Sequence, residues 1–295
     1  MLTETQRARM MECPKGKIDM VLDTDTYNEI DDQYAISYAI HAPEKIRVQA
    51  FYAAPFTNQR SSGPADGMEK SYHEIKKVLK LAGKEGYPVF RGSETYLPDE
   101  KTPVPSDAMR DLAERAMKYS PEHPLYVVSI AAITNIASAL LAKPEISDRI
   151  VVIWVGCHAP HWEDNYEFNC RQDVAAARVV FDSGVPLVML PAQGTVSCFT
   201  TTGPELEYWL RGKNPLCEYL LDRTLEAGNE NGKGKPWSRV IWDVTGVGWL
   251  MNDENKQLMR DQTVPGRFLN TAITCPGTSG GRPANWCIIS TATGC

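Results

Sequence analysis

Short apolar runs alternate along most of the chain with stretches that are apolar on one helical face. The apolar runs occupy Ile18–Leu22, Ile46–Phe51, Tyr87–Phe90, Leu125–Ile130, Ile150–Val155 and Val185–Leu190. Several lack polar alternation, which is typical of parallel strands buried on both faces. Helices are predicted from near Asp31 and over Met68–Ala82, 107–118, Ile136–Ala142, Asp173–Asp182 and, within a mostly helical stretch from Pro204 onward, Ile241–Leu250. This alternation predicts an α/β fold, an open, mostly parallel, Rossmann-like sheet with helices on both faces.

The pattern supports one domain. Residues 17–265 contain all the predicted elements, and we find no linker or internal repeat that would divide them. Residues 1–16 are polar and are expected to form an N-terminal arm. Residues 266–295 are rich in Gly, Thr, Ser and Cys with weak periodicity, so we expect an atypical C-terminal tail and assign it no role.

Composition narrows the class of protein. The chain has 295 residues, a net charge of −6 and ordinary hydrophobic (43%) and charged (23%) fractions, with no block of Lys and Arg, which argues against a nucleic-acid partner. No apolar run approaches the ~20 residues that cross a bilayer. The N-terminus lacks the apolar core of a signal peptide, and the eight cysteines show no CxxC pair. We therefore expect a reduced, cytoplasmic protein without a zinc or redox-dithiol motif.

Four aspartates follow the first apolar run: Asp23, Asp25, Asp31 and Asp32. In open α/β sheets, ligands bind at the carboxyl ends of the strands. Four carboxylates within ten residues repel one another unless a positive charge lies among them, and a hard divalent cation is the simplest candidate. Helix capping is the alternative; it explains Asp31 or Asp32 but accounts poorly for Asp23 and Asp25.

Polar residues also follow other predicted strands. Asn58 follows the second strand, Thr134 the fourth, and Glu167 and Asn169 lie in the loop after the fifth, while Asp243 opens a late helix. Each alone has an ordinary reading, as a turn residue or a helix cap. Their convergence on one edge of the sheet favours a site.

Taken together, four segments resemble the nucleoside N-ribohydrolases, the inosine–uridine-preferring group and their relatives. Ile18–Ile40 resembles the strand–DxDxGxDD–helix signature of that family, and Ile130–Leu140 resembles its TNIA segment. Tyr166–Phe181 (YEFNCRQDVAAARVVF) resembles its EFN…DPEAA segment, and Trp242-Asp243 aligns with a late aspartate. The resemblance covers roughly residues 17–250, in the right order, and implies the nucleoside hydrolase fold.

The resemblance implies a role for each matching residue. A Ca²⁺ ion would be held by the side chains of Asp25, Asp32 and Asp243 and the carbonyl of Thr134. Asp25 would also take a proton from the attacking water, and Asp23 would orient the loop. The ribose hydroxyls would be bound by Asp31, Asn58, Glu167 and Asn169, with Asn165 as an addition. The implied activity is Ca²⁺-dependent hydrolysis of the N-glycosidic bond of a ribonucleoside, and we expect a homodimer or homotetramer.

The sequence departs from the family signature at two places. Asp25 and Asp31 are six positions apart where the signature has four, so TYNEI lengthens the loop and adds Glu29 as a further candidate ligand. Trp242 stands where pyrimidine-tolerant members have a histidine that acts as leaving-group acid. A tryptophan there resembles purine-specific relatives, in which the indole stacks on the base, so we expect purine ribosides to be favoured; core packing is the alternative.

Two histidines of the long loop, His158 and His161, could reach the leaving group and act as its acid, because histidine titrates near neutrality. The alternative is that both are solvated surface residues.

Two other functions are compatible with parts of the sequence. Val21–Thr26 (VLDTDT) also fits the DxDxT motif of haloacid dehalogenase-type phosphatases, with Asp23 as nucleophile and Asp25 as acid, but that reading leaves the TNIA and EFN segments unexplained. A relative that binds ribosides or other glycosides without efficient hydrolysis, or with altered specificity, is the second, and the lengthened loop is its main support.

Overall fold

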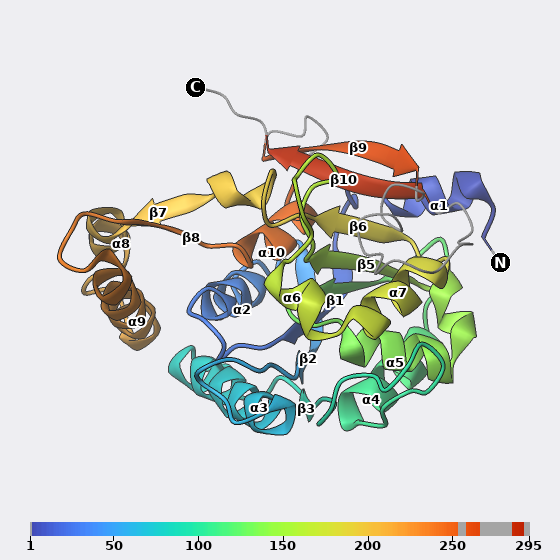
Figure 1. The fold of residues 1–295 in the computed structure, drawn as a ribbon, viewed down its shortest axis with the longest axis horizontal. Helices are drawn as coiled ribbons and strands as arrows, with labels where there is room; N and C mark the ends of the chain where they lie inside the picture. The colour runs from blue at the N-terminus through green and yellow to red at the C-terminus, as the bar shows by residue number, and fades with distance from the viewer. Residues whose placement is uncertain (1, 253–257, 266–284, 292–295) are drawn as a thin grey trace.

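The computed structural model describes residues 2–252, 258–265 and 285–291. Within these residues, eight strands form a central sheet (Figure 1). In spatial order they are β3 (Val89–Arg91), β2 (Ile46–Ala53), β1 (Ile18–Thr24), β4 (Leu125–Ser129), β5 (Ile150–Val155), β6 (Leu187–Leu190), β10 (Asn285–Thr291) and β9 (Met259–Pro265). Neighbours from β3 to β10 are parallel, and β9 runs antiparallel to β10.

Helices cover both faces of this sheet, as expected for buried parallel strands. One face carries α2 (Asp32–Ile40), α3 (Pro64–Leu81) and α10 (Val244–Leu250), and Leu216 and Leu220 of α9 (Pro215–Gly232) join the apolar core on that side. The other face carries α4 (Asp107–Ala116), α5 (Thr134–Ala142) and α7 (Val174–Asp182). In β1, Met20 and Leu22 belong to the first apolar core and Val21 to the second, which is why the strand is apolar without interruption.

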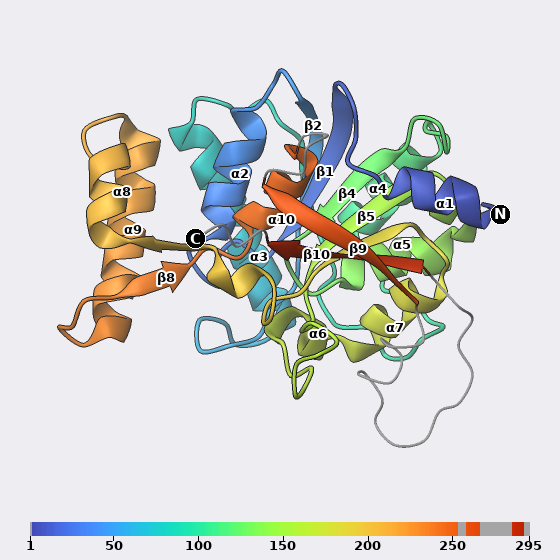
Figure 2. The ribbon, with the colours of Figure 1, turned by 90° about the horizontal axis from the view of Figure 1, so that it is seen from above.

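The remaining described elements are short or peripheral. They are α1 (Glu4–Met10), α6 (Phe168–Gln172), α8 (Gly203–Leu210), the 3₁₀ turns Pro144–Asp148 and Val196–Cys198, and a two-stranded sheet of β7 (Thr200–Thr202) and β8 (Ser238–Val240). Helices α8 and α9 lie at one end of the molecule, beyond α2 and α3 (Figure 2). The Tyr34 hydroxyl joins α9 to α2 through Thr224, at 2.8 Å. Among the described residues, no helix combines the length and apolarity that a membrane span needs.

The structure confirms the predicted α/β class and the six predicted strands, with bounds that shift by a few residues. Helix α1 was not expected, because residues 1–16 are polar; a capping box between Thr3 and Gln6 starts it, and Met10 and Met11 are buried. Helix α6 was also missed. It begins within the long loop because the Glu167 side chain accepts the backbone N–H groups of Asn169 and Cys170.

Strand β10 lies in the stretch that was expected to be a tail. It pairs with β6 and β9, so residues 285–291 extend the sheet. The rest of that stretch, residues 266–284 and 292–295, lies outside the described residues. The division into arm, domain and tail stays a prediction.

The order of the strands creates the site. From β1 the chain moves outward through β2 and β3, and then returns to place β4 on the other side of β1. The strand order therefore reverses between β1 and β4. In open parallel sheets, the loops at such a switch point diverge at the carboxyl ends of the strands and leave a crevice for a ligand.

Substitution of Trp154 of β5 would test how tightly the second core is packed. Its side chain is fully buried, its indole Nε1 donates to the Ala131 carbonyl at 3.0 Å, and its ring lies 5.9 Å from that of Phe181. Trp154→Ala should lower the free energy of unfolding by about 3–5 kcal/mol, measured by urea denaturation, because the lost contacts leave a cavity. Trp209→Ala, at a side chain 64% exposed, is the matched control and should change it by about 0.5 kcal/mol or less. Equal losses from both variants would contradict this packing.

Candidate active site

The acidic loop begins where β1 ends. Asp23 and Thr24 are the last residues of β1, and Asp32 is the first residue of α2. Asp23, Asp25, Asp31 and Asp32 are all buried, each at most 1% exposed. The strand end, the loop and the helix start thus keep four carboxylates out of water at the switch point of the sheet.

A late residue completes the cluster. Asp243 directly precedes α10, which packs beside α2, and its backbone N–H donates to Asp31 Oδ2 at 3.3 Å across 212 positions of sequence. Carboxylate oxygens of Asp31, Asp32 and Asp243 all lie within 4.8 Å of one another. The structure therefore brings the two ends of the predicted catalytic domain together, as a shared ion would require.

Burial dominates the electrostatics of this cluster. It raises the pKa of Asp32 to about 7 and, together with the neighbouring Glu29 and Asp32 carboxylates, that of Asp31 to about 8. The pKa values of Asp25 and Asp243 rise well above their usual range, first because of burial and then because of the surrounding carboxylates. Each shift expresses a cost of keeping these groups ionised together without a compensating positive charge.

Unpartnered oxygens show that the residues fit a cation. Both carboxylate oxygens of Asp25, and Oδ2 of Asp32, are buried and accept no hydrogen bond from the described residues. Buried acceptors without a donor are rare in folded proteins and call for an ion or water. An oxygen-only donor set of this kind suits a hard divalent cation. The cluster can hold a metal.

Asp23 and Thr134 face other partners. Asp23 accepts hydrogen bonds from Ser129 Oγ at 2.9 Å and from Asn135 Nδ2 at 2.8 Å, and burial raises its pKa to about 7. Those bonds join the end of β1 to β4 and α5, which fits the expectation that Asp23 orients the loop. The Thr134 hydroxyl donates to Asp173 Oδ2 at 2.7 Å, so the side chain is engaged at the start of α5.

A cavity of about 350 Å³ adjoins the cluster. Of the predicted site residues, its described lining includes Asp31, Glu167, Asn169, Trp242 and Asp243, together with the further candidates Glu29 and His158. The other lining residues are Asn28, Ile130, Val155, Tyr166, Phe168, Ala192 and Gln193. Predicted residues that do not line it are Asp23, Asp25, Asp32, Asn58, Thr134, His161 and Asn165.

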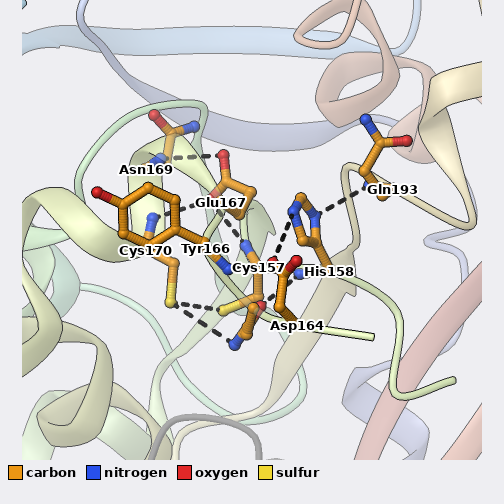
Figure 3. Close-up of polar contacts among 9 residues, drawn as sticks. Cys157, His158, Asp164, Tyr166, Glu167, Asn169, Cys170 and Gln193 are labelled. Atoms are coloured by element: carbon orange, nitrogen blue, oxygen red, sulfur yellow. Dashed lines mark hydrogen bonds and ion pairs between the residues drawn. The ribbon is translucent and has the colours of Figure 1, made fainter. Parts of the chain in front are cut away.

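Glu167 organises the loop on one side of the cavity (Figure 3). Its Oε2 accepts the backbone N–H groups of Cys157 at 2.9 Å and Cys170 at 2.8 Å, and its Oε1 accepts that of Asn169 at 2.9 Å. Cys157 adopts a left-handed backbone, with φ of 60°, so the chain turns sharply as it leaves β5. Asn169 Nδ2 in turn donates to the Val155 carbonyl at 2.9 Å, which fixes α6 to the end of that strand.

Two predicted sugar ligands are held by neighbours instead. Asn58 Nδ2 donates to Asn28 Oδ1 at 2.6 Å, so the lengthened loop places its own Asn28, which lines the cavity, against Asn58. Asn165 Oδ1 accepts the His158 backbone N–H at 2.6 Å and braces the 156–169 loop. Trp242 is half-buried; it packs against the first core and also lines the cavity, and stacking on a base stays a prediction.

The sequence did not reveal Arg239 as part of this site. Its Nη2 lies 2.6 Å from Glu29 Oε2, so the candidate extra ligand pairs with an arginine of β8. The positive charge of Arg239 also opposes the rise in the pKa of Asp31. No motif signals this residue, because β8 has three residues and its contact with the acidic loop spans 210 positions.

A larger cavity, of about 570 Å³, lies at the opposite edge of the sheet. Its lining includes Ile18 and Tyr126, at the amino ends of β1 and β4, and the exposed Arg47. Ligands of open parallel sheets bind at the carboxyl ends, so we place the functional site at the smaller cavity beside the acidic cluster.

Comparisons with known proteins show which family and fold this chain resembles. A family model described as inosine-uridine preferring nucleoside hydrolase matches residues 20–280. The chain is 29% identical over 251 residues to a pyrimidine-specific ribonucleoside hydrolase, RihA, of Citrobacter koseri, covering 76% of this chain and 77% of the relative. Among solved structures, it resembles a purine-preferring ribonucleoside hydrolase from Gardnerella vaginalis, with a TM-score of 0.69, 19% identity and 92% of each chain covered. A plant nucleoside hydrolase, PpNRh1, gives a TM-score of 0.71 at 16% identity, covering 94% of this chain and 95% of that one.

Binding of a divalent cation can be measured as thermal stability. Added Ca²⁺ should raise the melting temperature of the metal-free protein, and EDTA should reverse the gain. At a Ca²⁺ concentration 100 times its Kd, the free energy of unfolding should rise by about 2.7 kcal/mol. Asp243→Asn should abolish most of the gain while leaving the metal-free protein no less stable, because it removes one of several repelling buried charges.

Asp164→Asn is the matched control for this experiment. Its side chain is 63% exposed, so the Ca²⁺-dependent gain should match that of the unmodified protein. A gain that survives unchanged in Asp243→Asn would contradict the site.

Proposed function

This chain belongs to the inosine-uridine preferring nucleoside hydrolase family, and from that membership we propose that it hydrolyses the N-glycosidic bond of ribonucleosides, favours purine ribosides and depends on Ca²⁺. One observation carries the proposal: the buried carboxylates of Asp31, Asp32 and Asp243 meet at the wall of a cavity that Glu167 and Asn169 also line. The alternative of a haloacid dehalogenase-type phosphatase has no support in the family match.

The proposed ligands of Ca²⁺ are Asp25, Asp32, Asp243 and the Thr134 carbonyl. The unpartnered oxygens of Asp25 and Asp32 support the first two, and the short distances to Asp243 support the third. Bound there, Ca²⁺ would supply the positive charge that acidifies and orients a water molecule. Asp31 also lies within the cluster. We propose that it lies between the ion and the ribose and binds a ribose hydroxyl.

Asp25 is the proposed general base. Hydrolysis of a glycosidic bond proceeds through an oxocarbenium-like sugar, which water attacks at the anomeric carbon. Both oxygens of Asp25 are without a hydrogen-bond partner in the described chain, so either can accept the proton of that water. The ribose hydroxyls are bound by Asp31, Glu167 and Asn169, which line the cavity, and by Asn58 and Asn165 after a rearrangement of their present contacts.

Trp242 supports the purine preference. Its indole lines the cavity next to Asp243. We propose that the base attached to the bound ribose lies against it. Stacking on an aromatic side chain contributes about 1–3 kcal/mol per base and is larger in area for a purine. The curated relative named above is pyrimidine-specific, so the preference needs a direct test.

Asp25→Asn tests the catalytic proposal. The unmodified protein should release ribose from inosine in the presence of Ca²⁺ and lose that activity with EDTA. At saturating Ca²⁺, Asp25→Asn should lower kcat about 10²–10⁴-fold, the usual contribution of a general base. The measurement is reducing-sugar release, with p-nitrophenyl riboside as a second substrate.

Two results would redirect the proposal. Binding of ribose without turnover of either substrate would favour the non-catalytic relative, for which the Asn28–Asn58 hydrogen bond is the supporting contact. Turnover that is indifferent to both EDTA and Asp25→Asn would overturn the role of the acidic cluster.

Trp242→Leu tests the base preference. It should lower kcat/KM for inosine about 5- to 150-fold, by loss of the stacking surface, and change kcat/KM for uridine less. Trp242→Phe keeps an aromatic face and should retain most of the activity on inosine. Equal losses on inosine and uridine in the leucine variant would mean that Trp242 serves the core rather than the base.

A further inference from the structure

His158 lines the candidate cavity. It follows the sharp turn after β5 and lines the same cavity as Tyr166 and Trp242. Several carboxylate and amide side chains of that cavity, among them Asp31, Glu167 and Asn169, are assigned to the ribose. Of the aromatic side chains that remain, Trp242 offers a stacking face, and His158 offers a ring nitrogen that can donate a hydrogen bond.

One contact favours a particular tautomer of this ring. The backbone N–H of Gln193 donates to His158 Nδ1 at 3.2 Å (Figure 3). A backbone amide can only donate, so this contact favours the neutral tautomer with the lone pair on Nδ1 and the ring proton on Nε2.

Nε2 is available for a ligand. Its one ion-pair neighbour among the described residues, Asp164 Oδ1, lies 3.9 Å away, beyond hydrogen-bond range. The His158 side chain is 12% exposed, whereas that of Asp164 is 63% exposed. Burial lowers the pKa of His158, with Asp164 and a backbone hydrogen bond with Cys157 acting in the opposite direction, which favours the neutral ring.

Building on the proposed nucleosidase function, we propose that neutral His158 donates a hydrogen bond from Nε2–H to the nucleobase as it leaves. When the bond between C1′ and the base nitrogen breaks, its electron pair moves onto the base, and a donor on the base ring stabilises that charge. The proton stays on Nε2, because imidazole with a lone pair on Nδ1 is a hydrogen-bond donor and a very weak acid. Asp25 takes one proton of the attacking water, the remaining hydroxyl joins C1′, and solvent protonates the released base.

The test compares a leaving group that needs this donor with one that does not. Inosine releases a base that carries the charge poorly, whereas p-nitrophenyl riboside releases a phenolate that is stable near neutral pH. His158→Leu should lower kcat/KM for inosine about 10- to 150-fold, the usual worth of a hydrogen bond to a charged group, and that for p-nitrophenyl riboside about threefold or less.

A conservative variant separates donation from proton transfer. His158→Gln places an amide N–H near the position of Nε2 and should recover at least about tenfold over His158→Leu on inosine, since only a neutral donor is required. His123→Leu, at an exposed histidine beside the cavity at the opposite edge of the sheet, is the control and should leave both substrates unchanged. Melting temperatures with Ca²⁺ verify that each variant is folded.

The possible outcomes are distinct. Equal losses on the two substrates in His158→Leu would mean a structural role and overturn the proposal. No recovery by His158→Gln would overturn the neutral-donor role in favour of proton transfer. If the unmodified protein hydrolysed neither substrate, the proposed function would fail and this inference with it, whereas normal turnover with indifferent His158 variants would overturn this inference alone.

Discussion

The mutual repulsion of buried carboxylates is the constraint on which the rest of the structure depends. Asp25, Asp31, Asp32 and Asp243 are all buried at the carboxyl ends of parallel strands, and burial raises the pKa of each. In the described chain, Arg239 is the positive side chain that moderates the pKa of Asp31, and it is already paired with Glu29. The arrangement is stable as an ionised cluster only when a cation adds its charge.

The fold holds this cluster in place through polar contacts in an otherwise apolar core. Asp23 joins the end of β1 to Ser129 of β4 and Asn135 of α5, and Glu167 gathers three backbone N–H groups around the turn after β5. Such fully satisfied buried networks specify one geometry of the strand ends. The part of the cavity wall that Glu167 and its neighbours form is therefore in place before a ligand binds. Such preorganisation is the condition for electrostatic stabilisation of a charged transition state.

The elements that could be predicted from the sequence are those whose formation depends on neighbouring residues. Buried strands such as Ile150–Val155 are apolar throughout, and Ser106 and Asp173 cap their helices, so these elements follow from nearby residues. The sequence did not reveal α6, whose start depends on the Glu167 side chain, or β10, whose pairing with β6 joins distant parts of the chain. Single residues are harder still: the contacts of Arg239 with Glu29 and of Asn28 with Asn58 arise from the lengthened loop, and no spacing rule encodes them. The ligand set and the oligomeric state stay predictions.

The most direct measurement is a crystal structure of the protein grown with Ca²⁺, with the ion located by its anomalous scattering. We expect one ion whose ligands include oxygens of Asp25, Asp32 and Asp243, at about 2.3–2.6 Å, with the remaining positions open to water on the cavity side. An ion bound elsewhere, or a cluster that holds only water at saturating Ca²⁺, would contradict the central claim that these carboxylates are assembled around a metal.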